Sequence, residues 1–143
     1  MHDPIPGSCL CGASRFQLIP PTEFCSHCHC RSCRKSHAAP LVTWTSVPEA
    51  QLQVLGADLT TYKSSQNVTW LFCRLCGSHL FYRCTDAPGR VYVSVASLDG
   101  PLDRQPDSHV SYEEKVPWLH LQDGLPCFVG KTDELCQPEG RGR

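Results

Sequence analysis

The segment Cys28-His29-Cys30-Arg31-Ser32-Cys33 holds three thiols within six residues, spaced as C-x-C-x-x-C. Each gap is short enough for one backbone turn to direct all three sulfurs at a single point. Zinc binds thiolates at about 2.3 Å; four protein ligands are typical of structural zinc, and three with an open fourth position are typical of catalytic zinc. The segment therefore predicts a metal site whose role depends on its fourth ligand.

Several neighbours of this segment could provide that fourth ligand. Cys25 stands three residues before Cys28, so these four cysteines alone could close a saturated site. The imidazoles of His27, His29 and His37 are further candidates, although His29 lies between two ligands and is expected to point away from the metal. Spacing alone leaves both the open and the closed site in play.

A second set of cysteines is divided between two distant motifs. Cys9 and Cys11 form a C-x-C that is closed by Gly12, and Cys73 and Cys76 form a C-x-x-C followed by glycine. Glycine permits a positive φ, which lets backbone N–H groups turn toward the sulfurs. The four thiols would make a structural zinc site that joins the N-terminal strand to a later hairpin. The alternative is a set of buried thiols without metal.

The cysteine content, 11 of 143 residues, raises the question of the redox compartment. The number is odd, the spacings are those of metal ligands, and the first residues lack the basic and apolar regions of a signal peptide. We therefore expect a reducing, cytoplasmic environment in which thiols stay free. No apolar run approaches the ~18 residues that cross a bilayer. The formal net charge of −1, with scattered basic residues, argues against a nucleic-acid partner.

Strand-like segments dominate the chain, and the length suits one domain. Alternating, β-branched or aromatic segments lie at residues 13–19, 23–26, 41–45, 51–55, 59–63, 68–72, 80–83 and 91–95. Only residues 34–37 are expected to form a helical turn, and residues 99–126 an ordered loop. The sequence predicts a mainly β domain over residues 7–128, between a lead-in at 1–6 and a polar tail at 129–143.

The order of the motifs identifies a resemblance. G-S-C-x-C-G is followed by C-H-C-x-x-C-R-K and then by F-C-x-x-C-G-S-x-L-F-Y. This order resembles the glutathione-dependent formaldehyde-activating enzyme family, which also contains centromere protein V. Later blocks are similar as well: residues 88–93, 97–99, 115–118 and 123–126. Ala38 departs from the family, because many members carry glycine at this position.

The resemblance implies a fold, two metal ions and an activity. The fold would be a zinc-stapled domain of two packed β-sheets, similar to a small Rab nucleotide-exchange protein. The activity would be that of a carbon–sulfur lyase that joins formaldehyde to glutathione to give S-(hydroxymethyl)glutathione. The implied ligands are Cys9, Cys11, Cys73 and Cys76 for a structural zinc, and Cys28, Cys30 and Cys33 for a catalytic zinc.

The predicted chemistry fits the residues of the central segment. A metal deprotonates a coordinated thiol outright, so a substrate thiol in the open position would be held as a thiolate. Three thiolates give the site a formal charge of −1, which favours thiol capture over water activation. Arg31, Arg34 and Lys35 could pair with the two carboxylates of glutathione. Alternatively, they form a solvated basic loop that offsets the charge of the thiolates.

Aromatic side chains could line a substrate pocket near this segment. The candidates are Trp44, Tyr82 and Trp118, although aromatic residues of strands more often belong to the core. Three cysteines fall outside both predicted sites and are expected to have no catalytic role. They are Cys84, Cys127 and Cys136.

A function of a different class stays in play: a non-catalytic, zinc-stabilised protein-binding module. Centromere protein V is associated with microtubules and chromatin and carries a long basic N-terminal extension. Here six residues precede Gly7 and contain no basic tract, which favours the enzyme. The expected partners are then a small thiol such as glutathione and an aldehyde, with no nucleic acid or membrane. The sequence leaves the oligomeric state open.

Overall fold

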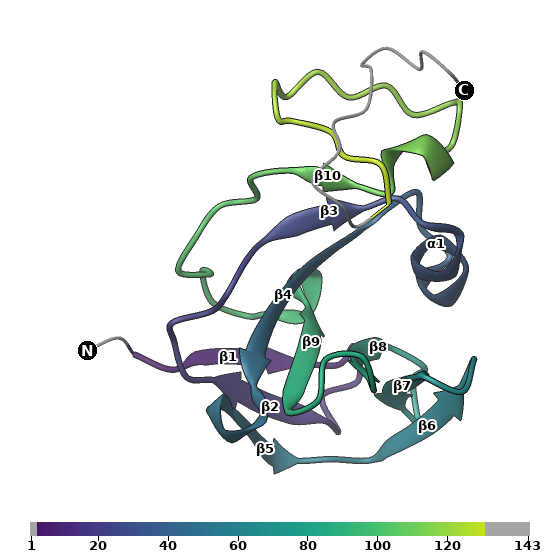
Figure 1. Cartoon of the computed structure of the whole chain (residues 1–143). Coiled ribbons are helices and arrows are strands. Elements are labelled where there is room, and N and C mark those ends of the chain that lie inside the picture. The colour runs from purple at the N-terminus through teal and green to yellow at the C-terminus, as the bar shows by residue number, and fades with distance from the viewer. Residues whose placement is uncertain (1–2, 131–143) are drawn as a thin grey trace. The chain divides into compact units, whose positions relative to one another are not determined.

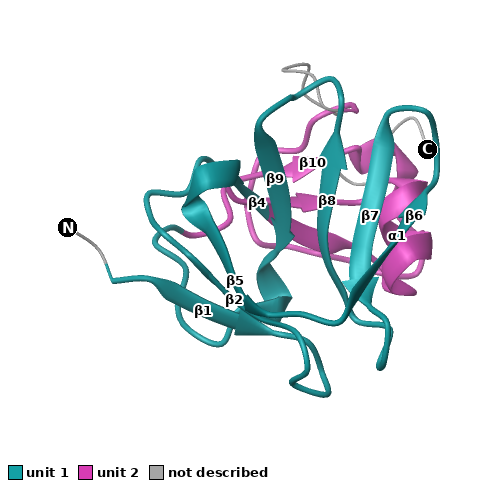
Figure 2. Cartoon of the chain, turned by 90° about the horizontal axis from the view of Figure 1, so that it is seen from below, with its two compact units in different colours: residues 1–24, 45–104 teal, residues 25–44, 105–143 magenta. Residues whose placement is uncertain are grey.

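The computed structural model describes residues 3–130 of the chain. The fold is mainly β, as predicted, and its strands belong to two sheets. The chain forms two compact units (Figure 2): residues 1–24 and 45–104 make unit 1, and residues 25–44 and 105–143 make unit 2. Most of the predicted polar tail lies outside the described residues.

A three-stranded antiparallel sheet in unit 1 consists of β1 (Ile5–Ser8), β2 (Arg15–Leu18) and β5 (Leu52–Gly56), in that order. Gly7 pairs with Phe16 across the first two strands. A Cβ at Gly7 would lie 2.2 Å from the Phe16 ring, so this position requires glycine. β1 starts within the predicted lead-in. It tolerates Pro6 because it is an edge strand.

The remaining strands of unit 1 form an antiparallel run: β6 (Leu59–Lys63), β7 (Val68–Cys73), β8 (His79–Cys84) and β9 (Arg90–Ser94) (Figure 1). The predicted strands at these positions are confirmed to within a residue or two. Their register brings aromatic side chains together: Trp70 opposes Tyr82, which opposes Tyr92. The two tyrosine rings stack 4.5 Å apart. Two 3-10 helices also belong to unit 1: η1 (Glu49–Gln51) and η2 (Val95–Ser97).

The hydrophobic core of unit 1 includes two of the predicted metal ligands. Phe16 and Phe81 meet edge to face, with ring centroids 4.8 Å apart. Cys9 and Cys73 are buried in the same cluster of side chains. The other buried members are Ile5, Leu18, Val47, Leu80, Val91 and Val93. One predicted metal site is therefore anchored in this core.

Unit 2 is built on β3 (Ser26–Cys28), which pairs antiparallel with β4 (Val42–Pro48) and parallel with β10 (His109–Val110) (Figure 1). β4 begins in unit 2 and continues into unit 1. β10 lies in the segment predicted as ordered loop. Its two residues carry no strand pattern of their own and become a strand by pairing with β3. A 3-10 helix, η3 (Tyr112–Glu114), follows.

The α-helix of unit 2, α1 (Arg31–His37), is longer than predicted. A helical turn was predicted only after Cys33, but the helix starts at Arg31 because Cys30 caps it: the Cys33 N–H donates to Cys30 Sγ. The helix ends at His37, and its C-cap Ala38 is left-handed with φ of 49°. Glycine is favoured in this conformation, so Ala38 carries a conformational cost that glycine would avoid.

Candidate metal centres

Four sulfurs in unit 1 converge from two turns, as the sequence predicts. Cys9 and Cys11 follow β1, Cys73 ends β7, and Cys76 lies in the turn before β8. All four Sγ atoms lie within 4.8 Å of one another. The Sγ of Cys11 is 3.6 Å from that of Cys9 and 3.8 Å from that of Cys73. Sulfurs on a tetrahedral zinc are about 3.8 Å apart, so this four-sulfur cluster fits zinc.

Hydrogen-bond donors surround the four-sulfur cluster. The Ser14 N–H donates to Cys9 Sγ over 3.2 Å, and the Ser78 hydroxyl lies 3.2 Å from Cys76 Sγ. The Ser78 hydroxyl and N–H lower the pKa of Cys76 to about 5. The Ala13 N–H lowers the pKa of Cys11, but the neighbouring sulfurs, Cys9 first, raise it to about 12. Without a cation, ionisation of one thiol therefore makes ionisation of its neighbours less favourable.

Three sulfurs in unit 2 converge from the central segment. Cys28 ends β3, Cys30 is the N-cap of α1, and Cys33 lies in the first turn of that helix. Their Sγ atoms lie within 4.8 Å of one another, and those of Cys28 and Cys33 are 3.4 Å apart. Cys28 and Cys33 are buried, whereas Cys30 is half-buried. This three-sulfur cluster is therefore reached from solvent most readily beside Cys30.

The surroundings of the three-sulfur cluster favour a bound cation. The proximity of Cys30 raises the pKa of Cys28 to about 11. The pKa of Cys33 is also raised, mainly by Cys28 and then by Cys30. The indole N–H of Trp44 donates to Cys33 Sγ over 3.2 Å. A metal ion would supply the positive charge that lets these clustered thiols ionise together.

The candidate fourth ligands stand outside this cluster in the described part of the chain. Cys25 is fully buried, but it is not among the sulfurs that lie within 4.8 Å of one another. His29 Nε2 lies 2.8 Å from His109 Nδ1. His27 Nδ1 lies 2.8 Å from the Thr43 hydroxyl. Within residues 3–130, the ligand atoms that gather at this cluster are therefore three sulfurs.

The basic residues of the central segment lie on α1. Arg31 and Lys35 are exposed. The Arg31 N–H donates to Glu114 Oε1, which fixes the start of the helix. Arg34 is half-buried, and its Nε donates to the carbonyl oxygen of His29 over 3.1 Å. Arg34 therefore supports the loop between the clustered cysteines, while the other two side chains face solvent.

A third group of side chains in unit 2 was missed by the sequence analysis. His27, His109 and Asp123 each offer a ligand atom, and these atoms lie within 4.8 Å of one another. Burial, followed by the charges of His109 and His27, lowers the pKa of His29 to about 4. Burial also lowers the pKa of His27. Residues 123–126 entered the sequence analysis only as a similar block, because no short spacing links them to His27.

The three aromatic candidates have different environments. Trp44 and Tyr82 are buried, in agreement with the expected core positions. Trp118 is 67% exposed, so the expectation that it belongs to the core is wrong. It lies outside the strands, in a turn-rich segment where the strand-based argument does not apply.

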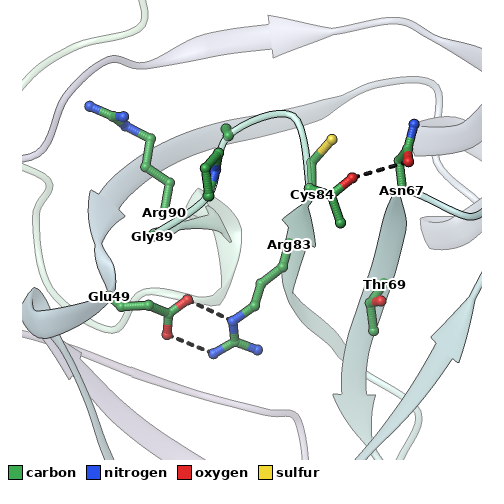
Figure 3. Close-up of a pocket in the computed structure, with 10 residues that line it drawn as sticks. Glu49, Asn67, Thr69, Arg83, Cys84, Gly89 and Arg90 are labelled. Carbon is green, nitrogen blue, oxygen red and sulfur yellow. Dashed lines mark hydrogen bonds and ion pairs between the residues drawn. The ribbon is translucent and has the colours of Figure 1, made fainter.

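A cavity of about 290 Å³ in unit 1 is separate from the four-sulfur cluster (Figure 3). Its wall includes Arg83, which forms a two-fold ion pair with Glu49 at 2.6 and 2.8 Å. Arg90 also lines it, but its guanidinium pairs with Glu23.

The cysteines outside both clusters lie in different places. Cys84 lines this cavity, and Cys127 is half-buried in unit 2. Cys136 lies outside the described residues.

Comparisons with known proteins identify the family. The model of the glutathione-dependent formaldehyde-activating enzyme family matches residues 4–114. The chain therefore belongs to this family, and the resemblance noted in its sequence is confirmed. Over residues 3–130, the structure has no helix that is long and apolar enough to cross a membrane.

Two relatives and one solved structure are similar to this chain over most of their own lengths. A Halomonas elongata protein, provisionally named as a glutathione-dependent formaldehyde-activating enzyme, is 29% identical over 90% of this chain and 88% of its own. A Schizosaccharomyces pombe protein named as an uncharacterized lyase is 24% identical over 90% and 92%. The crystal structure of a Rhodobacter sphaeroides protein has a TM-score of 0.57 and 26% identity, covering 69% of this chain and 92% of that one.

Proposed function

We propose that the protein is a zinc-dependent carbon–sulfur lyase of the S-(hydroxymethyl)glutathione synthase type. The single observation that carries this proposal is the cluster of Cys28, Cys30 and Cys33, which has three sulfurs and not four among residues 3–130. Three protein ligands with one open position are typical of catalytic zinc. Family membership supports a thiol–aldehyde reaction, and the lyase name of one relative agrees with it.

Two zinc ions with different roles follow from this proposal. The four-sulfur cluster is complete, so its zinc is structural and ties β1 to the β7–β8 turn. The three-sulfur cluster holds the catalytic zinc. When bound, this zinc supplies the positive charge that keeps an added thiol ionised near neutral pH.

The proposed reaction is an addition that involves no oxidation. The glutathione sulfur attacks the carbonyl carbon of formaldehyde, so one C–S bond forms and the C=O π bond breaks. The thiol proton ends on the former carbonyl oxygen, giving S-(hydroxymethyl)glutathione. The reverse reaction breaks the same C–S bond. The indole N–H of Trp44 donates to Cys33 Sγ. This hydrogen bond disfavours attack of the Cys33 sulfur on the aldehyde.

The exposed basic side chains are the proposed contacts of the substrate carboxylates. Arg31 and Lys35 project from the helix that carries Cys33. Arg34 completes the basic set, although its Nε already supports the ligand loop. Each exposed ion pair contributes at most about 1 kcal/mol, so single substitutions at Arg31 or Lys35 should raise KM modestly.

The test is catalysed exchange at chemical equilibrium, because the addition also proceeds without an enzyme. Two-dimensional ¹³C exchange spectroscopy of labelled formaldehyde with glutathione measures the interconversion of free and adduct carbon. We expect wild-type protein to accelerate the exchange in proportion to its concentration, Cys30→Ser to abolish the acceleration, and Cys84→Ser to preserve it. No acceleration by zinc-loaded wild type would contradict the proposal and favour the non-catalytic binding module.

A further inference from the structure

We propose that unit 2 contains a third metal site, formed by His27, His109 and Asp123, that takes a divalent first-row transition ion. The ligand atoms of these residues lie within 4.8 Å of one another. Two imidazoles with one carboxylate are the donor set of many catalytic zinc sites and of non-haem ferrous sites. None of the three belongs to either cysteine cluster.

Strand register brings the two imidazoles together. His27 on β3 is the register partner of His109 on β10, and the two strands run parallel. The ring centroids are 4.9 Å apart. His109 is 1% exposed, so its ring is fixed by packing. Two of the three ligands are therefore held by the sheet rather than by a loop.

Hydrogen bonds orient both rings in the manner of metal-binding histidines. His27 Nδ1 lies 2.8 Å from the hydroxyl of Thr43, its cross-strand partner, which leaves Nε2 as the ligand nitrogen. His109 Nδ1 lies 2.8 Å from His29 Nε2, which leaves Nε2 as its ligand nitrogen. A metal-binding histidine commonly uses its second nitrogen for such a contact, which fixes the tautomer and the direction of the ring.

Asp123 provides the adjustable third ligand. Its Oδ1 accepts the Leu125 N–H over 3.1 Å, and its Oδ2 lies 2.8 Å from His109 Nε2. Nitrogen and oxygen ligands at 2.0–2.1 Å from a tetrahedral zinc are about 3.3 Å apart. The two atoms must therefore separate by about 0.5 Å to admit an ion. The Asp123 side chain is 39% exposed, so it has room for this movement.

A cavity gives an ion access to these ligands. His109 and Asp123 line a space of about 350 Å³, together with Tyr112, Leu121 and Leu125. Because three ligand atoms gather here in the described part of the chain, the remaining coordination positions would open toward this cavity. The site is thus built like a catalytic centre, with room for water or a small ligand.

The competing account is a chain of hydrogen bonds that runs from Asp123 through His109 to His29 without an ion. Cobalt(II) distinguishes the two. We would load untagged full-length protein with two equivalents of zinc and titrate cobalt(II), following visible d–d bands that lack sulfur-to-cobalt charge transfer. Asp123→Asn keeps the shape of the side chain but removes its charge, and Asp107→Asn is the matched exposed control.

We expect wild type and Asp107→Asn to bind one further cobalt, and Asp123→Asn to bind it at least tenfold more weakly while keeping two zinc ions. Paramagnetic shifts in histidine-labelled protein should be largest on His27 and His109, followed by His29, whose ring contacts that of His109. The proposal is overturned if wild type takes no third ion, if Asp123→Asn binds it equally well, or if the largest shifts fall on His2, His37, His79 or His120.

Discussion

The two cysteine clusters differ in what they connect. In the four-sulfur cluster, neighbouring sulfurs come from Cys11 and Cys73, which are 62 positions apart. In the three-sulfur cluster, Cys28 and Cys33 are only five positions apart. A cross-link that closes a long loop restricts the unfolded chain far more than one within a single turn. A metal in the four-sulfur cluster would therefore stabilise the whole fold, whereas a metal in the three-sulfur cluster would bind a segment that is already folded.

The surroundings of the two clusters agree with this difference. Cys9 and Cys73 are part of the core of unit 1, so their cluster is continuous with the packing of two sheets' strands. The three-sulfur cluster instead depends on the cap of a seven-residue helix and on one indole. Loss of a ligand should therefore have a global effect in the first case and a local effect in the second.

The largest expected effect separates the two clusters directly. Cys9→Ser and Cys76→Ser should unfold or aggregate, because structural zinc binding is coupled to folding. Cys30→Ser should stay folded and retain about one zinc per chain, since a complete four-sulfur site remains. Circular dichroism and zinc analysis of the purified variants measure both properties. Equal collapse of all three variants would show that the two clusters do not differ in role.

The next effect tests the indole that contacts the three-sulfur cluster. Trp44→Phe removes the N–H donor of Cys33 Sγ, so transfer of the labile zinc to a chelator should become several-fold faster. Trp70→Phe is the matched control, because its indole N–H donates to Ser64 Oγ in unit 1. Both variants should lose about 1–3 kcal/mol of unfolding free energy from lost packing. Equal zinc-transfer rates in the two variants would show that the Trp44 hydrogen bond does not stabilise zinc binding at the three-sulfur cluster.

Much of the difference between the two cysteine clusters was predictable, because it follows from short spacings between the cysteines. The spacing of Cys28, Cys30 and Cys33 allows a single turn to bring the three sulfurs together, and the strands β6 and β7 follow from local β-branched and aromatic residues. β10 and the contacts of His109 were not predictable, because they depend on pairing with β3 about 80 residues earlier. The start of α1 was missed because cysteine is an unusual helix cap.

A smaller effect is expected at the end of α1, beside the three-sulfur cluster. Ala38→Gly should stabilise the protein by about 0.5–1 kcal/mol, because Ala38 has a positive φ that glycine adopts without strain. Ala50→Gly is the control: this residue lies in η1 with a negative φ, so glycine there should be destabilising. Urea unfolding measures both. Destabilisation by Ala38→Gly would contradict the left-handed cap.

The smallest effect concerns the cysteines outside both clusters. Serine at positions 84, 127 and 136 together should leave two zinc ions per chain and unchanged exchange activity. Within residues 3–130, neither Cys84 nor Cys127 belongs to a cluster, and the spacing of Cys136 in the sequence matches neither site. Zinc analysis and the exchange measurement on the triple variant check this. Loss of one zinc equivalent would show that a ligand has been assigned wrongly.

If the zinc proposed at the three-sulfur cluster has an open fourth position, an added thiol should bind there, and cobalt-substituted protein makes this binding visible. Glutathione is titrated into wild type and Cys25→Ser while the thiolate-to-cobalt charge-transfer band is recorded. We expect the thiol to perturb the band in both proteins, with identical spectra before addition, because Cys25 stands outside the cluster. An unchanged wild-type spectrum up to millimolar glutathione, with a response only in Cys25→Ser, would show that Cys25 closes the site.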